Sequence, residues 1–157
     1  MRMPMSVGPL ILCLVAGVTL GCKAEAPEAG VDQRTAVLLP AEAAAAVRAE
    51  MRTMLGSLNA VLVAIAGSDT ATMREAAQAS GLAAAADPAL EPLLPAPFLV
   101  LATATHRQFD SLALAVTAGI PADSVIRRLG TLTANCVACH AAFRLAVTPG
   151  TLRILPR

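Results

Sequence analysis

The stretch that decides the fold lies near the C-terminal end of the chain and reads Cys136-Val137-Ala138-Cys139-His140-Ala141-Ala142-Phe143-Arg144. Its first five residues follow the pattern C-x-x-C-H, the attachment signature of c-type haem. Residues three apart lie on one face of a helix, about one turn apart, so both sulfurs can bond to one porphyrin while the adjacent histidine binds its iron. The pattern predicts a single covalent haem c on Cys136 and Cys139, with His140 as axial ligand.

Length and composition predict one helical domain. The chain has 157 residues, which is enough for one hydrophobic core. Hydrophobic residues make up 56%, much of it alanine, and aromatic residues only 2%. Alanine favours helix over strand, and a haem would supply the bulk that a core poor in aromatic residues lacks. The formal charge of +1 offers no support for nucleic-acid binding, so no such partner is expected.

Residues 1–21 predict an export signal. Arg2 precedes an apolar run over residues 7–20, which is too short for a comfortable membrane span. Gly21-Cys22 then resembles a bacterial lipoprotein site with Cys22 as the lipidated residue, and ordinary cleavage near Ala26 is the alternative. Haem is attached on the outer side of the inner membrane in bacteria, so signal and motif agree. We expect a lipid-anchored protein on the periplasmic side of the cell envelope.

The rest of the chain divides into a tether, a helical domain and a tail. Residues 22–40 are small, charged and proline-containing without periodicity, which predicts a flexible tether; an arm packed on the domain is the alternative. The domain over residues 41–148 carries four helical patterns, at 41–66, 72–86, 98–118 and 122–146. No stretch alternates with a period of two. These patterns predict an all-α, antiparallel four-helix bundle without a sheet, haem on its last helix, and a tail over residues 149–157.

A bundle with haem on its last helix resembles the class II c-type cytochromes, the cytochrome c′ family and its low-spin relatives. The likeness rests on the run C-x-x-C-H-x-x-[FY]-R at residues 136–144, close to the chain end. No methionine follows His140, which disfavours class I cytochromes, since their axial methionine lies downstream of the motif. The resemblance implies that His140 is the proximal iron ligand. It also implies that Arg144, one turn later, lies beside the haem; a solvated helix residue is the alternative.

The group at the sixth coordination position of the iron decides between two functions. In the family, the first helix faces this position with methionine in low-spin members and with an apolar side chain in five-coordinate ones. Met51 lies on the inward stripe of that helix and is our first choice, with Met54 next. Family members often carry arginine one turn before the ligand; if Arg48 fixes this register, Arg52 stands at the ligand position instead. With methionine bound the protein is an electron carrier, and with an open site it binds a gas such as nitric oxide.

Other interpretations of the motif are weaker. A zinc site would combine Cys136, Cys139, His140 and His106, yet structural zinc sites draw on two separated pairs of ligands. A thiol–disulfide oxidoreductase would place C-x-x-C at the start of a helix, after a strand. The lone His106 is expected to be a surface or hydrogen-bonded core residue rather than a second iron ligand. No acid–base pair accompanies the haem, so we expect no enzyme but a carrier with a redox partner protein in the envelope; pairing of two copies stays open.

Overall fold

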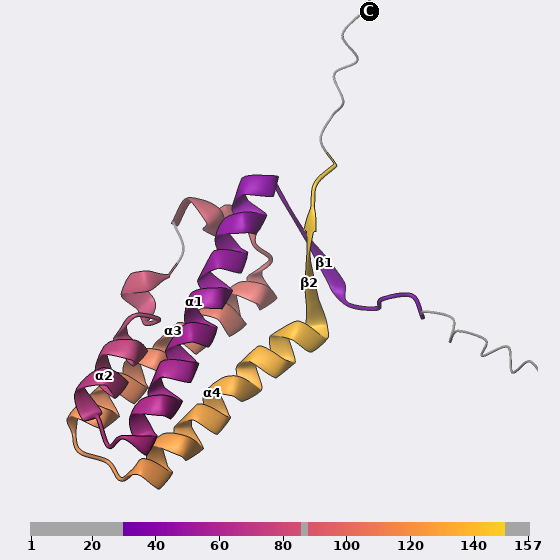
Figure 1. The fold of residues 1–157 in the computed structure, drawn as a ribbon. Coiled ribbons are helices and arrows are strands. Elements are labelled where there is room, and N and C mark those ends of the chain that lie inside the picture. Colours follow the sequence, from indigo (N-terminus) through magenta and orange to yellow (C-terminus); the bar gives the residue numbers. More distant parts are fainter. Residues whose placement is uncertain (1–29, 86–87, 150–157) are drawn as a thin grey trace, which may run out of the picture. The chain divides into compact units, whose positions relative to one another are not determined.

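The computed structural model describes residues 30–85 and 88–149. In the unit that begins at Gln33, the elements run β1 (Thr35–Leu39), α1 (Ala41–Ala66), α2 (Thr70–Gln78), short 3-10 helices at Leu82–Ala84 and Pro88–Leu93, α3 (Ala96–Thr117), α4 (Ala122–Ala142) and β2 (Phe143–Val147). The fold is predominantly helical, as the composition predicts (Figure 1). The export signal, Cys22 and the tail beyond residue 149 lie outside the described residues.

Helix α1 has the predicted bounds, and α2 is shorter than predicted. The carboxylate of Asp69 caps α2 by accepting a hydrogen bond from the amide of Thr72 at 3.0 Å. The helix ends at Gln78 instead of near residue 86. A turn follows it, in which the side chains of α1 and α3 bond to Ser80 and Leu82. These contacts from distant parts of the chain replace the hydrogen bonds of a longer helix.

The structure contains a two-stranded sheet, so the prediction of no sheet is wrong. Helix α4 ends at Ala142, and β2 follows it directly. This strand pairs in parallel with β1, from Thr35 opposite Phe143 to Leu39 opposite Val147. Figure 1 shows the two strands side by side next to the N-terminal half of α1. Because Val37 and Leu39 are buried, the last part of the predicted tether is an ordered arm packed on the domain.

Two apolar clusters form the interior. The helical cluster lies between the four helices and includes Phe109, Leu112 and Leu132. The sheet cluster joins β1 to the N-terminal half of α1 and the start of α3. There the ring of Phe98 meets the ring of Phe143 of β2 edge to face, with centroids 5.7 Å apart. Helix α4 contributes to both clusters, and its cysteines lie where one gives way to the other.

Among the described helices, α1 alone has the length and mean hydropathy of a helix that can cross a membrane. It also places Val61 in the helical cluster and Val47 in the sheet cluster. A helix that buries one stripe in the core of a domain meets the same two criteria. The finding is therefore weak support for a membrane span.

Candidate haem-binding site

Cys136 and Cys139 lie one turn apart near the C-terminal end of α4. Both side chains are half-buried, and both are free thiols. Cys136 packs against the helical cluster, and its Sγ lies 3.9 Å from the carbonyl oxygen of Leu132. Cys139 packs against the sheet cluster. Both sulfurs thus lie on the inner side of α4 and remain partly accessible to an incoming group.

His140 is exposed, and its ring has no hydrogen-bond partner among the described residues. Its carbonyl oxygen, in the last turn of α4, lies 3.4 Å from Nη1 of Arg34, which donates to it. The carbonyls of the last turn of a helix have no partner within the helix, so a cation is favourable there. The contact ties the arm that carries β1 to the motif. Nothing in the sequence pattern pointed to Arg34.

The donor atoms of the motif do not converge on one point. No group of three or more His, Cys, Asp or Glu side chains within residues 30–85 and 88–149 is arranged to hold a metal ion. Structural zinc requires sulfur and nitrogen ligands around a single ion, which this arrangement does not supply. Covalent haem makes a different demand, because its sulfurs bond to the edge of the porphyrin and only the imidazole binds iron. Two thiols on one helix face beside an unengaged imidazole fit that group.

The two thiols do not have the properties of a redox-active pair. Burial raises the pKa of Cys136, and burial together with the neighbouring Cys136 raises the pKa of Cys139. Reactive cysteines have the opposite character, a lowered pKa at the start of a helix. The motif lies at the other end of α4, where the helix dipole disfavours a thiolate. The geometry thus disfavours a thiol–disulfide oxidoreductase.

The two candidate methionines of α1 have different neighbours. Met51 is half-buried and packs against the sheet cluster, as does Cys139. Met54 packs against the helical cluster and lines a cavity of about 170 Å³ together with Glu50 and His106. Of the two methionines, Met51 packs against the same cluster as Cys139, which directly precedes His140.

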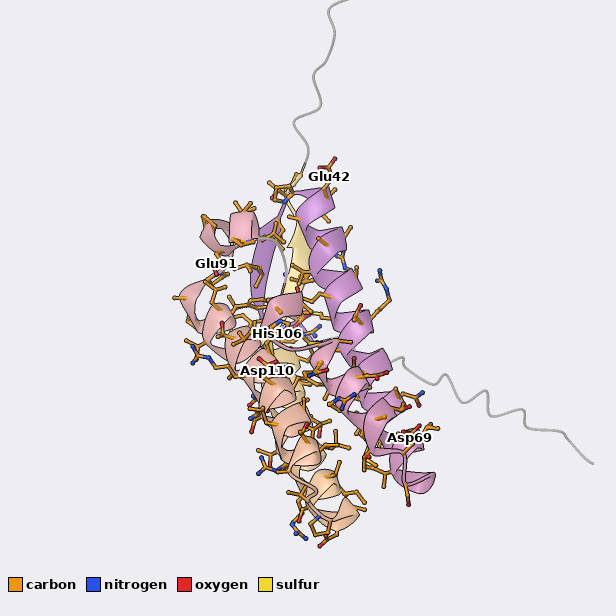
Figure 2. The ribbon with its side chains drawn as sticks, turned by 90° about the vertical axis from the view of Figure 1, so that its left-hand side faces the viewer. Glu42, Asp69, Glu91, His106 and Asp110 are labelled. Carbon is orange, nitrogen blue, oxygen red and sulfur yellow. The ribbon has the colours of Figure 1, made fainter. Side chains whose placement is uncertain are left out.

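His106 belongs to a separate buried network. It is 4% exposed, and its Nε2 lies 2.6 Å from Oε1 of Glu50. Its Nδ1 lies 2.9 Å from the carbonyl oxygen of Ser80. The hydrogen bond to Glu50 raises the pKa of His106, and this effect exceeds the opposing effect of burial. With both ring nitrogens engaged, His106 is a hydrogen-bonded core residue, as predicted. In Figure 2 it lies inside the helical unit, one turn before Asp110 on α3.

Arg144 is not on the haem-motif helix. Phe143 has an extended backbone, with φ of −125° and ψ of 151°, so α4 ends before Arg144 is reached. Arg144 lies in β2 opposite Ala36, and its side chain is exposed. The prediction that it follows His140 by one helical turn is wrong, because pairing with β1 extends this part of the chain.

Comparison of the chain with protein-family models, with curated proteins and with solved structures finds no match.

Proposed function

We propose that this protein is a c-type cytochrome related to class II, with one haem c covalently bound to Cys136 and Cys139. The observation that carries the proposal is the C-x-x-C-H motif on α4, with two free, half-buried thiols on the inner side and an unengaged imidazole beside them. When bound, the haem supplies reversible one-electron chemistry. Cys136 and Cys139 would hold the porphyrin, His140 would bind its iron, and the apolar clusters would shield the group from water. The four helices would act as the bundle that encloses it.

We assign the sixth iron position to Met51, which makes the protein an electron carrier. Two observations support the register that puts Met51 at this position. Met51 is half-buried in the same cluster as Cys139, while Arg52, which the alternative register would place there, is exposed. A charged, exposed arginine does not suit an apolar haem pocket.

The partner is a redox protein of the cell envelope, reached from a lipid anchor on Cys22. The support for this location comes from the sequence alone, since the export signal and Cys22 precede the described residues. Arg144, at the start of the strand that follows the motif, is proposed to lie near a haem carboxylate. A guanidinium binds carboxylates with two parallel hydrogen bonds, and it keeps its charge at any physiological pH.

The test is covalent haem in the exported protein. The chain is produced in a host that attaches haem c, denatured, separated on a gel and stained for haem. We expect one bound haem, lost from the double variant Cys136→Ala/Cys139→Ala and retained in His106→Leu, which changes a histidine outside the motif. If the denatured wild-type chain carries no haem on the gel, the proposal is overturned.

Carbon monoxide binding distinguishes the two proposed functions, electron transfer and gas binding. Because a methionine on iron blocks the sixth position, the reduced protein should change its absorption spectrum little when the gas is added. The variant Met51→Leu should bind carbon monoxide readily, and Met54→Leu should behave as the wild type does. A wild type that binds the gas at once is five-coordinate. In that case gas binding, with nitric oxide as the expected ligand, replaces electron transfer as the function.

A further inference from the structure

Glu50 and His106 form a hydrogen-bonded pair between α1 and α3, which is an ion pair when His106 is protonated. Oε1 of Glu50 on α1 lies 2.6 Å from Nε2 of His106 on α3, with side chains 18% and 5% exposed. The other ring nitrogen of His106 bonds to the carbonyl oxygen of Ser80, in the turn after α2. The pair therefore connects α1, α3 and the turn after α2.

Further hydrogen bonds hold the same turn. The hydroxyl groups of Ser57 on α1 and Ser80 are 2.8 Å apart, and both residues are buried. The amide of Leu82 donates to Oδ2 of Asp110 on α3 at 3.0 Å. These bonds hold the turn to which His106 is bonded. His106 is therefore itself held in position where it meets Glu50.

A buried ion pair is weak support for stability, since an apolar pair of similar size often serves as well. The pair instead constrains the orientation of the helices that carry it. Apolar side chains repack with little cost when a helix rotates slightly, whereas a charged hydrogen bond inside a protein loses most of its strength when it is misaligned. The pair is therefore suited to fixing the rotation of α1 about its axis.

The residue after Glu50 is the proposed iron ligand. Consecutive residues of an α-helix point about 100° apart, so a helix that directs Glu50 at α3 also sets the direction of Met51. Met51 points to the sheet cluster, where Cys139 and Phe143 pack. Arg52, another 100° around, is exposed.

From this arrangement we infer that Glu50 and His106 are positioning residues for Met51: their bond fixes the rotation of α1 so that the thioether faces the haem motif. The inference rests on the proposed function. Neither residue is proposed to touch the haem or the iron. Loss of their bond frees α1 to turn, and the thioether then competes less well for the sixth position.

The experiment compares carbon monoxide affinity in reduced, haem-loaded variants. In His106→Leu, we expect the affinity to rise at least about tenfold over the wild type, because one charged hydrogen bond no longer holds α1 in place. Glu50→Gln keeps an amide oxygen that accepts from Nε2, and it should stay near the wild type. Thr53→Ala is the control, since it removes a hydrogen bond within the same helix, to the carbonyl oxygen of Ala49, and leaves the pair and the turn after α2 intact. If His106→Leu does not fold, Glu50→Ala takes its place.

A second readout needs no haem. In the haem-free mature chain, the methyl signal of Met51 in a nuclear magnetic resonance spectrum reports its contact with the side chains of the sheet cluster. This contact should weaken in His106→Leu and persist in Thr53→Ala.

The possible results separate the inference from the proposed function. Unchanged gas affinity and an unchanged methyl contact in His106→Leu overturn the inference and leave the haem protein intact. A wild type that carries haem and binds the gas at once also overturns it, since Met51 is then no ligand. A wild type without covalent haem overturns the proposed function, and the methyl contact still decides whether the pair positions Met51.

Discussion

At the scale of single residues, Gly81 shows how closely the turn after α2 is packed. Its backbone, with φ of −72° and ψ of −178°, is open to any residue. A methyl group added there would collide with the carboxylate of Asp110, which accepts the hydrogen bond from Leu82. We expect Gly81→Ala to lower the free energy of unfolding by about 1–3 kcal/mol, measured by urea denaturation.

Gly67 is the control for this change. An added methyl group at Gly67 would meet only the carbonyl oxygen of Ala64, at an ordinary 3.8 Å. Gly67→Ala should therefore stay within about 0.5 kcal/mol of the wild type. In the background Asp110→Ala the cost of Gly81→Ala should shrink, because the two residues are coupled through one collision. Additive effects would contradict this account.

His106 predicts a pH dependence of stability with a definite sign. The hydrogen bond to Glu50 raises the pKa of His106 in the folded protein, so the folded state binds the proton more tightly than the unfolded chain does. The stabilisation is fully present below about pH 6.5, the pKa of unfolded histidine, and is lost as the pH rises through the raised pKa. The hydrogen bond to the carbonyl oxygen of Ser80 raises the pKa of His106 further.

The measurement is the urea midpoint as a function of pH. In the wild type it should fall as the pH rises above about 6.5, and His106→Leu should lack this fall because no imidazole titrates there. A wild-type midpoint that rises over the same range would show that burial, rather than Glu50, controls the proton on His106.

Local sequence patterns reveal some site residues and not others. The motif points to Cys136, Cys139 and His140 as the proposed haem-binding residues, because adjacency in sequence is what haem attachment requires. Glu50 and Arg34 gave no such signal. Their partners, His106 and the carbonyl of His140, lie far away in the sequence, and only the folded chain brings them together.

At the scale of elements, β1 predicts a sharp contrast between neighbouring leucines. Leu39 is fully buried in the sheet cluster, while Leu38 is 60% exposed. Leu39→Ala leaves a cavity between the strand and α1, and we expect it to cost about 2–5 kcal/mol. Leu38→Ala, the same change one position earlier, should cost less than about 0.5 kcal/mol. Urea denaturation measures both. Equal effects would mean that these residues behave as the flexible tether that their composition suggests.

The helices were predictable and the sheet was not, for a physical reason. A helix forms its hydrogen bonds within one segment, so periodicity and caps predict α1 and most of α3 and α4. A strand depends on its partner, and the partner of β2 lies near the other end of the domain. Phe143–Val147 carries helix-compatible residues, and it becomes a strand because Phe143 and Leu145 pack into the sheet cluster.

At the scale of the whole molecule, the composition and the position of the motif combine into one expectation. Phe98, Phe109 and Phe143 are the three aromatic residues of the chain, and the rest of the described interior consists mainly of Leu, Val, Ala and Met. The two thiols lie where the helical cluster gives way to the sheet cluster. A haem held there would contact both clusters and add the apolar bulk that the chain itself lacks.

The last prediction follows from this placement and concerns the stability of the complete domain. Apolar surface removed from water contributes about 25 cal/mol per Å², so a haem that packs between the clusters should raise the free energy of unfolding by at least about 3 kcal/mol. The measurement compares urea denaturation of the haem-loaded protein with that of the double variant Cys136→Ala/Cys139→Ala. The wild-type chain prepared without haem is the control for the substitutions themselves, and it should match the double variant. Equal stability of the loaded and haem-free chains would place the haem on the outside of α4, where it would stabilise neither cluster.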